Sequence, residues 1–179
     1  FFGIGSGDSA ILNLAERPST LADMRAYVEA VRALQATGET VWRGRTARLT
    51  WTSRALPIYL SAEGPRTLEL AGEIADGVIV NVGLQPSLVR DAVSHIHAGA
   101  RRAGRDPAKI DLWALVRANI TDDVAAGVEE IRMELLWRGE TVAPSMTVIR
   151  ASCRSPRTVV PSLPGPSKRT SLRASVLLT

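Results

Sequence analysis

"PIYLSAEGPRTLELAGEIADGVIVNVG", residues 57–83, is the stretch of this 179-residue chain that decides the fold. Residues 57–62 form a short apolar run typical of a strand, and residues 76–83 form a second run of the kind found in strands covered on both faces. Gly64-Pro65 opens a helix between them, because proline is favoured at the first helical position. This helix places three apolar residues on one side: Leu68, Ala71 and Ala75. The order predicts two parallel strands joined by a right-handed crossover.

The same alternation extends in both directions along the chain. Phe1–Gly5 resembles the end of a buried strand, and a helix runs from Thr20 to Gly38. A further helix is predicted over 86–103 and a strand over 110–120, followed by a helix capped by Asp122 or Asp123. About four strand-helix units therefore indicate an α/β fold. Two architectures fit: an open doubly wound sheet or about half of an eight-stranded barrel.

Two further local features are predicted: the ends of the helix between Thr20 and Gly38, and a small hairpin after it. Thr20 and Asp23 have the spacing of a capping box, and Gly38 can adopt the left-handed conformation that ends a helix. Residues 41–52 depart from the alternation and predict a small hairpin around Arg43-Gly44-Arg45, with Trp42 and Trp51 as packing residues.

Composition excludes several classes of protein. No apolar run reaches the length of a bilayer span, and "FFGIGSG" lacks the Met and basic stretch of a signal peptide, so we expect the chain to begin inside a fold. The net charge of +4 does not indicate nucleic-acid binding, because all 18 acidic residues precede residue 141 and the excess of basic residues lies after it. The single cysteine, Cys153, forms no disulfide framework, so a reducing cytoplasm is the expected compartment.

Residues 141–179 differ from the rest of the chain in composition. They are rich in Ser, Pro and Arg, contain no acidic residue and have no sustained apolar periodicity. This composition predicts a disordered or poorly ordered tail after a domain at 1–140. The alternatives are a basic docking tail and a reading frame lost near 131–145.

The turn Gly5-Ser6-Gly7-Asp8-Ser9-Ala10 fits G-x-G-x-x-[G/A], the fingerprint of a dinucleotide-binding turn. That site also needs an uninterrupted helix and an acid about 20 residues further on, whereas Arg17-Pro18 ends the first helix and Glu29 lies inside the second. A Rossmann site is therefore disfavoured. A plain strand-end turn and a loop whose small residues allow close approach of a ligand both remain. Asp8 is the acid best placed to meet such a ligand.

A second turn, Ser61-Ala62-Glu63-Gly64-Pro65, joins a strand to a helix. The first N–H groups of that helix have no intrahelical acceptor and can bind an anion, with Ser61 and Thr67 able to add hydroxyl groups. The alternative is a plain strand-helix turn. Because two such turns follow parallel strands, a shared ligand-binding edge is favoured.

The remaining candidate residues give weaker indications of a catalytic or metal-binding site. His95 and His97 are two positions apart on a helix and point in different directions, so we expect surface histidines and no metal site. Asp76 precedes a buried strand and is more typical of a cap than of a catalyst. The chain contains no H-E-x-x-H, P-loop or G-x-S-x-G motif.

Three segments carry a resemblance to a known family: residues 3–41, 57–83 and 99–113. Together they closely resemble the luciferase-like flavin and deazaflavin oxidoreductases, and within them the branch of methylene-tetrahydromethanopterin reductases and their bacterial relatives. The resemblance covers about residues 2–130 and does not reach the tail.

The resemblance implies a partial (β/α)8 TIM barrel with its N-terminal strands missing. It implies hydride transfer to or from a small-molecule substrate with coenzyme F-420 (F420), a deazaflavin, or with FMN as in sister branches. The cofactor-binding positions it implies are Gly5, Ser6, Gly7, Asp8, Ser61, Ala62, Glu63, Gly64 and Pro65. No catalytic residue is assigned, because the acid that the family places near the ring comes from its first strand. No membrane or nucleic-acid partner is expected, and a homo-oligomer is compatible with the family.

Two functions of different classes stay open at this point. One is an F420-dependent oxidoreductase, or part of one. The other is a non-catalytic α/β module whose glycine turns only close the fold.

Overall fold

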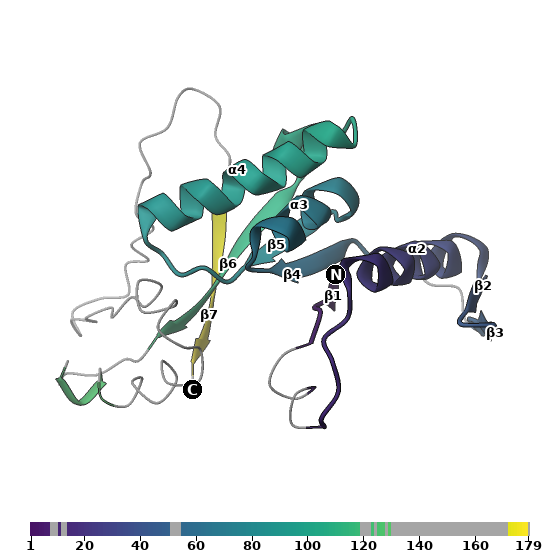
Figure 1. The fold of residues 1–179 in the computed structure, drawn as a ribbon, viewed down its shortest axis with the longest axis horizontal. Coiled ribbons are helices and arrows are strands. Elements are labelled where there is room, and N and C mark those ends of the chain that lie inside the picture. The colour runs from purple at the N-terminus through teal and green to yellow at the C-terminus, as the bar shows by residue number, and fades with distance from the viewer. Residues whose placement is uncertain are drawn as a thin grey trace.

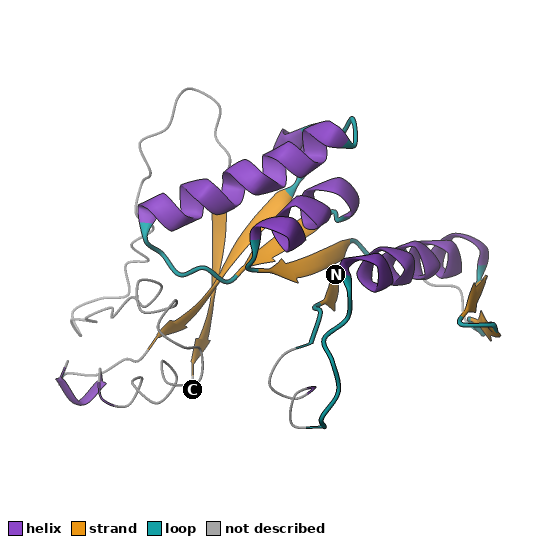
Figure 2. Cartoon of the chain, in the orientation of Figure 1, coloured by secondary structure: helices purple, strands orange, loops and turns teal. Residues whose placement is uncertain are grey.

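The apolar runs form one parallel sheet in a computed structural model of the chain, with strand order β1-β4-β5-β6-β7 (Figures 1 and 2). The strands are β1 (Phe2–Ile4), β4 (Ile58–Ala62), β5 (Gly77–Val80), β6 (Asp111–Ala118) and β7 (Leu172–Leu178). The helices are α2 (Leu21–Thr37), α3 (Pro65–Ile74), α4 (Pro86–Arg102) and the short 3-10 helix η1 (Pro107–Lys109). The structure describes residues 1–7, 11, 14–50, 55–118, 123, 125–127, 129 and 172–178.

A single hydrophobic core joins the sheet to the three helices. Alternate strand residues face α2, α3 and α4 because side chains of a strand point in turn to opposite faces. The most deeply buried side chains of this core are Val28, Ile58, Leu60, Leu68, Val78, Ile96 and Leu112. Burial of each large side chain stabilises the fold by roughly 1.5–3 kcal/mol.

The position of the helices decides between the two predicted architectures. α2, α3 and α4 contribute to the same core on one face of the sheet, and consecutive strands are added in one direction from β1 to β6. A doubly wound sheet would reverse direction and carry helices on both faces. The arrangement is therefore that of a barrel segment, in which every crossover passes over the outer face.

The predicted helix ends are confirmed. The Thr20 hydroxyl accepts from the Asp23 N–H at 3.1 Å, while the Thr20 N–H donates to Asp23 Oδ2 at 3.2 Å. Gly38 adopts φ 76°, and its N–H donates to the carbonyl of Leu34 at 2.9 Å. The carboxylate of Asp123 accepts from the N–H groups of Ala125 and Ala126 at 3.0 and 3.1 Å, so Asp123 caps the turn after β6 as predicted.

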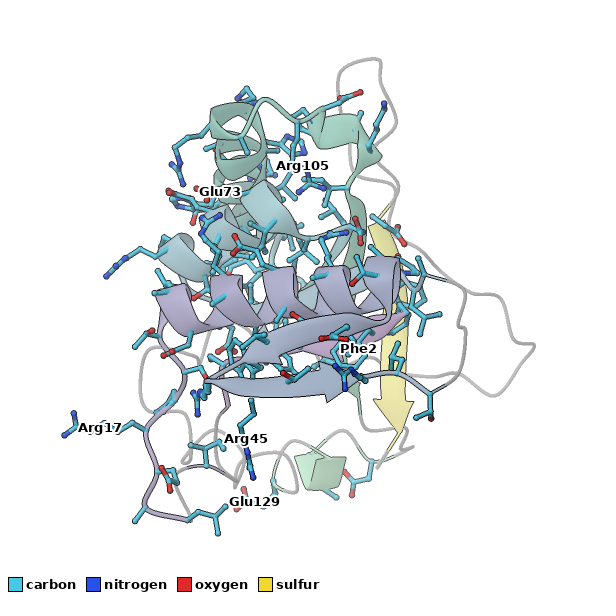
Figure 3. All side chains as sticks on the ribbon, turned by 90° about the vertical axis from the view of Figure 1, so that its right-hand side faces the viewer. Phe2, Arg17, Arg45, Glu73, Arg105 and Glu129 are labelled. Carbon is cyan, nitrogen blue, oxygen red and sulfur yellow. The ribbon has the colours of Figure 1, made fainter. Side chains whose placement is uncertain are left out.

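The predicted hairpin is also confirmed, as β2 (Glu39–Trp42) and β3 (Arg45–Arg48) paired antiparallel. Trp42 packs edge-on against Tyr27 of α2, with ring centroids 5.3 Å apart, which agrees with a packing role. Arg45 points away from α2 (Figure 3). Trp51 lies outside the described residues.

Two expectations about the chain ends differ from the structure. Phe1–Gly5 was expected to be the end of a buried strand, but Phe1 and Phe2 are 61% and 36% exposed. The reason is that β1 is paired on one side only among the described strands. Leu172–Leu178, within the segment expected to lack regular structure, forms β7 and pairs in parallel with β6. Residues 131–171 lie outside the described residues, so the division of the chain near residue 140 stays a prediction.

Asp76 has the structural role expected for it, at the amino-terminal edge of the sheet. Its carboxylate accepts from the Ile58 N–H at 2.8 Å and from the guanidinium of Arg32 at 2.9 Å. Arg105 donates to the carbonyls of Gly72 and Ala75 and so satisfies the end of α3. In the described part of the chain, no helix is long and apolar enough to cross a bilayer.

Candidate functional site

The two turns singled out in the sequence lie side by side at the carboxyl edge of the sheet. β1 and β4 pair with Ile4 opposite Leu60, so Gly5 follows directly opposite Ser61. A Cβ built on Gly5 would lie 3.8 Å from the Cβ of Ser61. The two turns therefore share the carboxyl edge of the sheet, which is where ligands bind in α/β folds.

The first turn is held in a shape that requires glycine. Gly7 has φ 91°, and a Cβ at this position would lie 2.4 Å from Cγ1 of Ile11. The carbonyl of Ser6 accepts from the N–H of Ser19 at 2.8 Å, which ties the turn to the start of α2. Of the predicted residues of this turn, the structure describes Gly5, Ser6 and Gly7, whereas Asp8 lies outside the described residues.

The second turn ends in a helix N-terminus that has no side-chain cap. Gly64 is the N-cap of α3 and has no side chain to accept a hydrogen bond, and Pro65 occupies the first helical turn without an N–H. Helix geometry leaves the N–H groups of Arg66 and Thr67 without an intrahelical acceptor, since the first bond of the ladder joins Leu68 N to Gly64 O at 2.9 Å. These donors and the positive end of the helix dipole suit an anion.

Space is available in front of this helix. A Cβ built on Gly64 meets no atom within 4 Å, and the residue has the extended conformation φ −79°, ψ 153°. Glu63, Gly64 and Pro65 are exposed, while Ala62 is buried at the strand end. An incoming phosphate could therefore approach the backbone without displacing a side chain.

Asn81, which sequence reasoning missed, joins the same edge from β5. Its N–H donates to the carbonyl of Ala62 at 3.3 Å, and its Nδ2 donates to Glu63 Oε1 at 3.0 Å. This pair holds the Glu63 carboxylate on the β5 side of the turn. The available signal was positional: Asn81 follows the apolar run 76–80 as Ser61 follows the run before it.

The face of the sheet opposite the helices carries a hydrogen-bonded group of side chains. The Tyr59 hydroxyl donates to Asp111 Oδ2 at 2.6 Å, and Trp113 Nε1 donates to the same oxygen at 2.8 Å. Phe1 stacks against Tyr59 with centroids 4.6 Å apart. Tyr59 and Asp111 begin their strands near the amino-terminal edge, so the group lies away from the two turns.

Among the described residues, no group of three or more His, Cys, Asp or Glu side chains that could hold a metal ion is found. His95 Nδ1 lies 3.2 Å from Glu69 Oε1 on α3, so its ring serves helix packing. Desolvation, together with the nearby charge of Arg101, lowers the pKa of half-buried His97. The expectation of surface histidines was therefore only partly met.

The comparison of sequences and the comparison of structures relate this chain to the same group of enzymes. A model of the luciferase-like monooxygenase family matches residues 1–157. The 5,10-methylenetetrahydromethanopterin reductase of Methanolobus tindarius is 34% identical over 132 residues, which are 69% of this chain and 40% of that protein. The F420-dependent glucose-6-phosphate dehydrogenase of Nakamurella multipartita is 30% identical over 154 residues, which are 79% of this chain and 44% of that protein.

A solved structure of an F420-dependent secondary alcohol dehydrogenase in complex with an F420-acetone adduct superposes with a TM-score of 0.59 at 28% identity. The superposition covers 80% of this chain and 46% of that one. The chain thus spans less than half the length of these relatives. The family match, together with consecutive parallel strands and the position of α2, α3 and α4 on one face of the sheet, shows that the chain belongs to the luciferase-like monooxygenase family and is part of a (β/α)8 barrel.

Proposed function

We propose that this chain is part of an F420-dependent oxidoreductase that transfers a hydride between the deazaflavin and a small molecule. The observation that carries the proposal is the uncapped N-terminus of α3 beside the Gly5 turn, at one carboxyl edge of the sheet. The relatives described above, named for F420 in both the sequence and the structure comparison, support the choice of cofactor.

The residues at this edge fit the phosphate-bearing tail of such a cofactor. The N–H groups of Arg66 and Thr67 would donate to phosphate oxygens, and the open space before Gly64 would admit them. Gly5, Ser6 and Gly7 would lie along the cofactor, where the absence of large side chains permits close backbone contact. Asp8 is proposed as the acid of the same loop.

The contribution of these residues to catalysis is positioning. A bound deazaflavin supplies two electrons as a hydride, so the protein needs to fix the donor and acceptor atoms at reacting distance. Holding the phosphate at α3, remote from the reacting ring, provides binding energy that orients the ring. Asn81 assists by holding the Glu63 carboxylate through Nδ2.

More specifically, we propose the activity of a methylenetetrahydromethanopterin reductase. The sequence motifs resemble that branch of the family, and a reductase with this name is 34% identical to the chain. The residues that would select such a substrate are not assigned. We further propose that the enzyme works in the cytoplasm, on the basis of its single cysteine.

A cofactor titration tests this function. A version of the chain extended to the length of its relatives is titrated with F420, and separately with FMN, while the fluorescence and absorbance of the cofactor are followed. We expect saturable quenching of F420 fluorescence. Tighter binding of FMN than of F420 would identify the cofactor as a flavin. No change with either cofactor would favour a non-catalytic α/β module.

A further inference from the structure

The turn at the proposed phosphate site contains an acidic residue, although the helix N-terminus beside it suits an anion. Glu63 directly precedes Gly64, the N-cap of α3, and is exposed at the carboxyl edge of the sheet. A carboxylate in this position repels the ligand that the N–H groups of Arg66 and Thr67 attract. Glu63 therefore lowers the affinity of the site for anions, and lowers it more for a ligand of higher charge.

Asn81 fixes where this negative charge lies. Its Nδ2 donates to Glu63 Oε1 at 3.0 Å, and its backbone N–H donates to the carbonyl of Ala62 at 3.3 Å. The backbone bond continues the parallel pairing of β5 with β4, so the position of Asn81 is set by the sheet. The bond between the two side chains keeps the Glu63 carboxylate beside the turn, on the side of β5.

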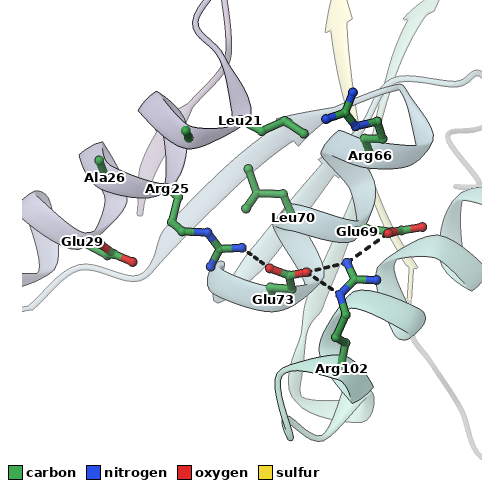
Figure 4. A pocket seen from close by; sticks show the side chains of 10 residues that line it. Leu21, Arg25, Ala26, Glu29, Arg66, Glu69, Leu70, Glu73 and Arg102 are labelled. Carbon is green, nitrogen blue, oxygen red and sulfur yellow. Dashed lines mark hydrogen bonds and ion pairs between the residues drawn. The ribbon is translucent and has the colours of Figure 1, made fainter.

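The two carboxylates within α3 are bound by arginines on the outer face (Figure 4). Glu73 accepts hydrogen bonds from Arg25 of α2 and from Arg102 of α4, and Arg102 also donates to Glu69 at 3.0 Å. Burial opposes the charge of Glu73, but the bonds from Arg102 and Arg25 outweigh it and lower its pKa. Because these ion pairs compensate both charges, neither carboxylate adds much to the field at the N-terminus of the helix.

Arg66 is the other charged residue of the segment 61–67. Its side chain lines a groove of about 450 Å³ between α2 and α3, together with Leu21 and Leu70 (Figure 4). Arg66 therefore lies on the α2 side of the turn, whereas Asn81 holds Glu63 on the β5 side. An anion at the N-terminus of α3 is attracted from one side and repelled from the other.

We propose that Glu63, positioned by Asn81, selects a phosphate diester over a phosphate monoester at this site. This selection rests on the proposed function, because it requires the phosphate to bind at the N-terminus of α3. A diester carries one negative charge, whereas a monoester carries about 1.5 to 2 at pH 7. The phosphate of F420 is a diester and that of FMN is a monoester. Repulsion by Glu63 acts on each charge, so it disfavours the monoester about twice as strongly in free energy.

The size of the effect follows from the Coulomb energy at an exposed site. Two unit charges a few ångströms apart in water change a dissociation constant by roughly three- to fivefold. Removing the charge of Glu63 should tighten the binding of a diester by about this factor and that of a monoester by about the square of it. The ratio of the two dissociation constants, monoester over diester, should therefore fall by roughly three- to fivefold.

Two matched ligands test the selection. One is the deazaflavin with a 5′-phosphate on its ribityl chain, and the other is the methyl ester of that phosphate. They share the ring and differ by one charge. The chain extended to the length of its relatives is titrated with both, and with F420, at low ionic strength, because salt screens exposed charges. Fluorescence of the deazaflavin gives each dissociation constant.

Glu63→Gln is the central variant. Glutamine keeps the Oε1 acceptor for Asn81 and removes the charge, so we expect the ratio to fall by about threefold or more. Glu63→Lys should lower the ratio further. Glu29→Gln on α2 removes an exposed carboxylate away from the turn and is the matched control, which should leave the ratio unchanged. Circular dichroism checks that each variant is folded.

Asn81→Ala tests the positioning role of Asn81. The substitution removes the bond to Glu63, while the backbone bond to Ala62 stays possible. We expect the ratio to fall part of the way towards that of Glu63→Gln. In the Glu63→Gln background the same substitution should have no effect on the ratio, because no charge is left to hold.

The outcomes separate this selection from the proposed function. If F420 binds and Glu63→Gln leaves the ratio unchanged, the selection by Glu63 is wrong and the proposed function stands. An equal effect of Asn81→Ala with and without the Glu63 charge overturns the positioning role of Asn81. If none of the three ligands binds, the phosphate site is wrong, and the proposed function fails together with the selection.

Discussion

Gly99 of α4 lies directly against the backbone of Glu69 on α3: a Cβ built on Gly99 would be 1.9 Å from the Glu69 carbonyl oxygen. The contact is reciprocal, since a Cβ on Gly72 of α3 would be 2.0 Å from the carbonyl oxygen of Ile96. The two helices therefore cross at a pair of glycines, and any side chain there must push their backbones apart.

Gly99→Ala is expected to destabilise the fold by about 1–3 kcal/mol or more, the range found when extra methyl groups are forced into a packed core. The clash is with backbone, which cannot rotate away as a side chain could. Urea unfolding followed by circular dichroism measures the change. Gly64→Ala is the control, because a Cβ there meets nothing within 4 Å and its φ of −79° is ordinary. Equal stability of both variants would contradict the packing described.

Tyr59→Phe should cost about 1–2 kcal/mol of stability, because it removes the hydrogen bond to Asp111 and leaves a half-buried carboxylate with one donor fewer. The Trp113 bond to the same oxygen limits the loss. Thermal and urea unfolding provide the measurement. Tyr27→Phe on α2, a tyrosine 37% exposed, should change stability by only a few tenths of a kcal/mol.

Gly64→Val should weaken F420 binding by about tenfold or more while leaving the fold intact. The valine side chain would occupy the open space through which a phosphate reaches the N–H groups of Arg66 and Thr67. Fluorescence titration measures the dissociation constant, and thermal unfolding checks the fold. Gln85→Val is the matched control, since Gln85 is the uncapped N-cap of the next helix, α4. If only Gln85→Val weakens binding, the phosphate lies at α4 and the assignment to this turn is wrong.

Acid should destabilise the protein partly through Glu73. Its folded-state pKa lies below the ordinary 4.5, so the carboxylate is stabilising above that value and this stabilisation is lost as the pH falls through the folded-state pKa. We expect the Tm of Glu73→Gln to be lower than that of the original chain at neutral pH and to fall less between pH 5 and about pH 3. Glu16→Gln, an exposed carboxylate with no ion pair in the described part of the chain, should follow the original curve. Parallel curves for Glu73→Gln and the original would show that the ion pairs of Glu73 with Arg25 and Arg102 do not stabilise the fold.

Local features were predictable because each depends on a few neighbouring residues. The Thr20–Asp23 capping box, the left-handed Gly38 and the hairpin around Arg43-Gly44 follow from backbone conformation and hydrogen bonds within four residues. The strand-helix alternation was equally predictable, because the spacing of apolar residues differs between strands and helices. The pairing of β7 with β6 was missed, because the segment that contains it has no comparable pattern.

The sequence by itself therefore determined the order of elements, the caps and the two glycine turns. Only the tertiary structure decided that α2, α3 and α4 lie on one face of the sheet, that Gly5 stands opposite Ser61, and that Asn81 reaches Glu63. It also joined Arg25 of α2, Glu73 of α3 and Arg102 of α4 through ion pairs. The reason is physical: a cap or turn is fixed by short-range sterics and hydrogen bonds, whereas strand register and helix crossing are fixed by burial of side chains distant in the sequence.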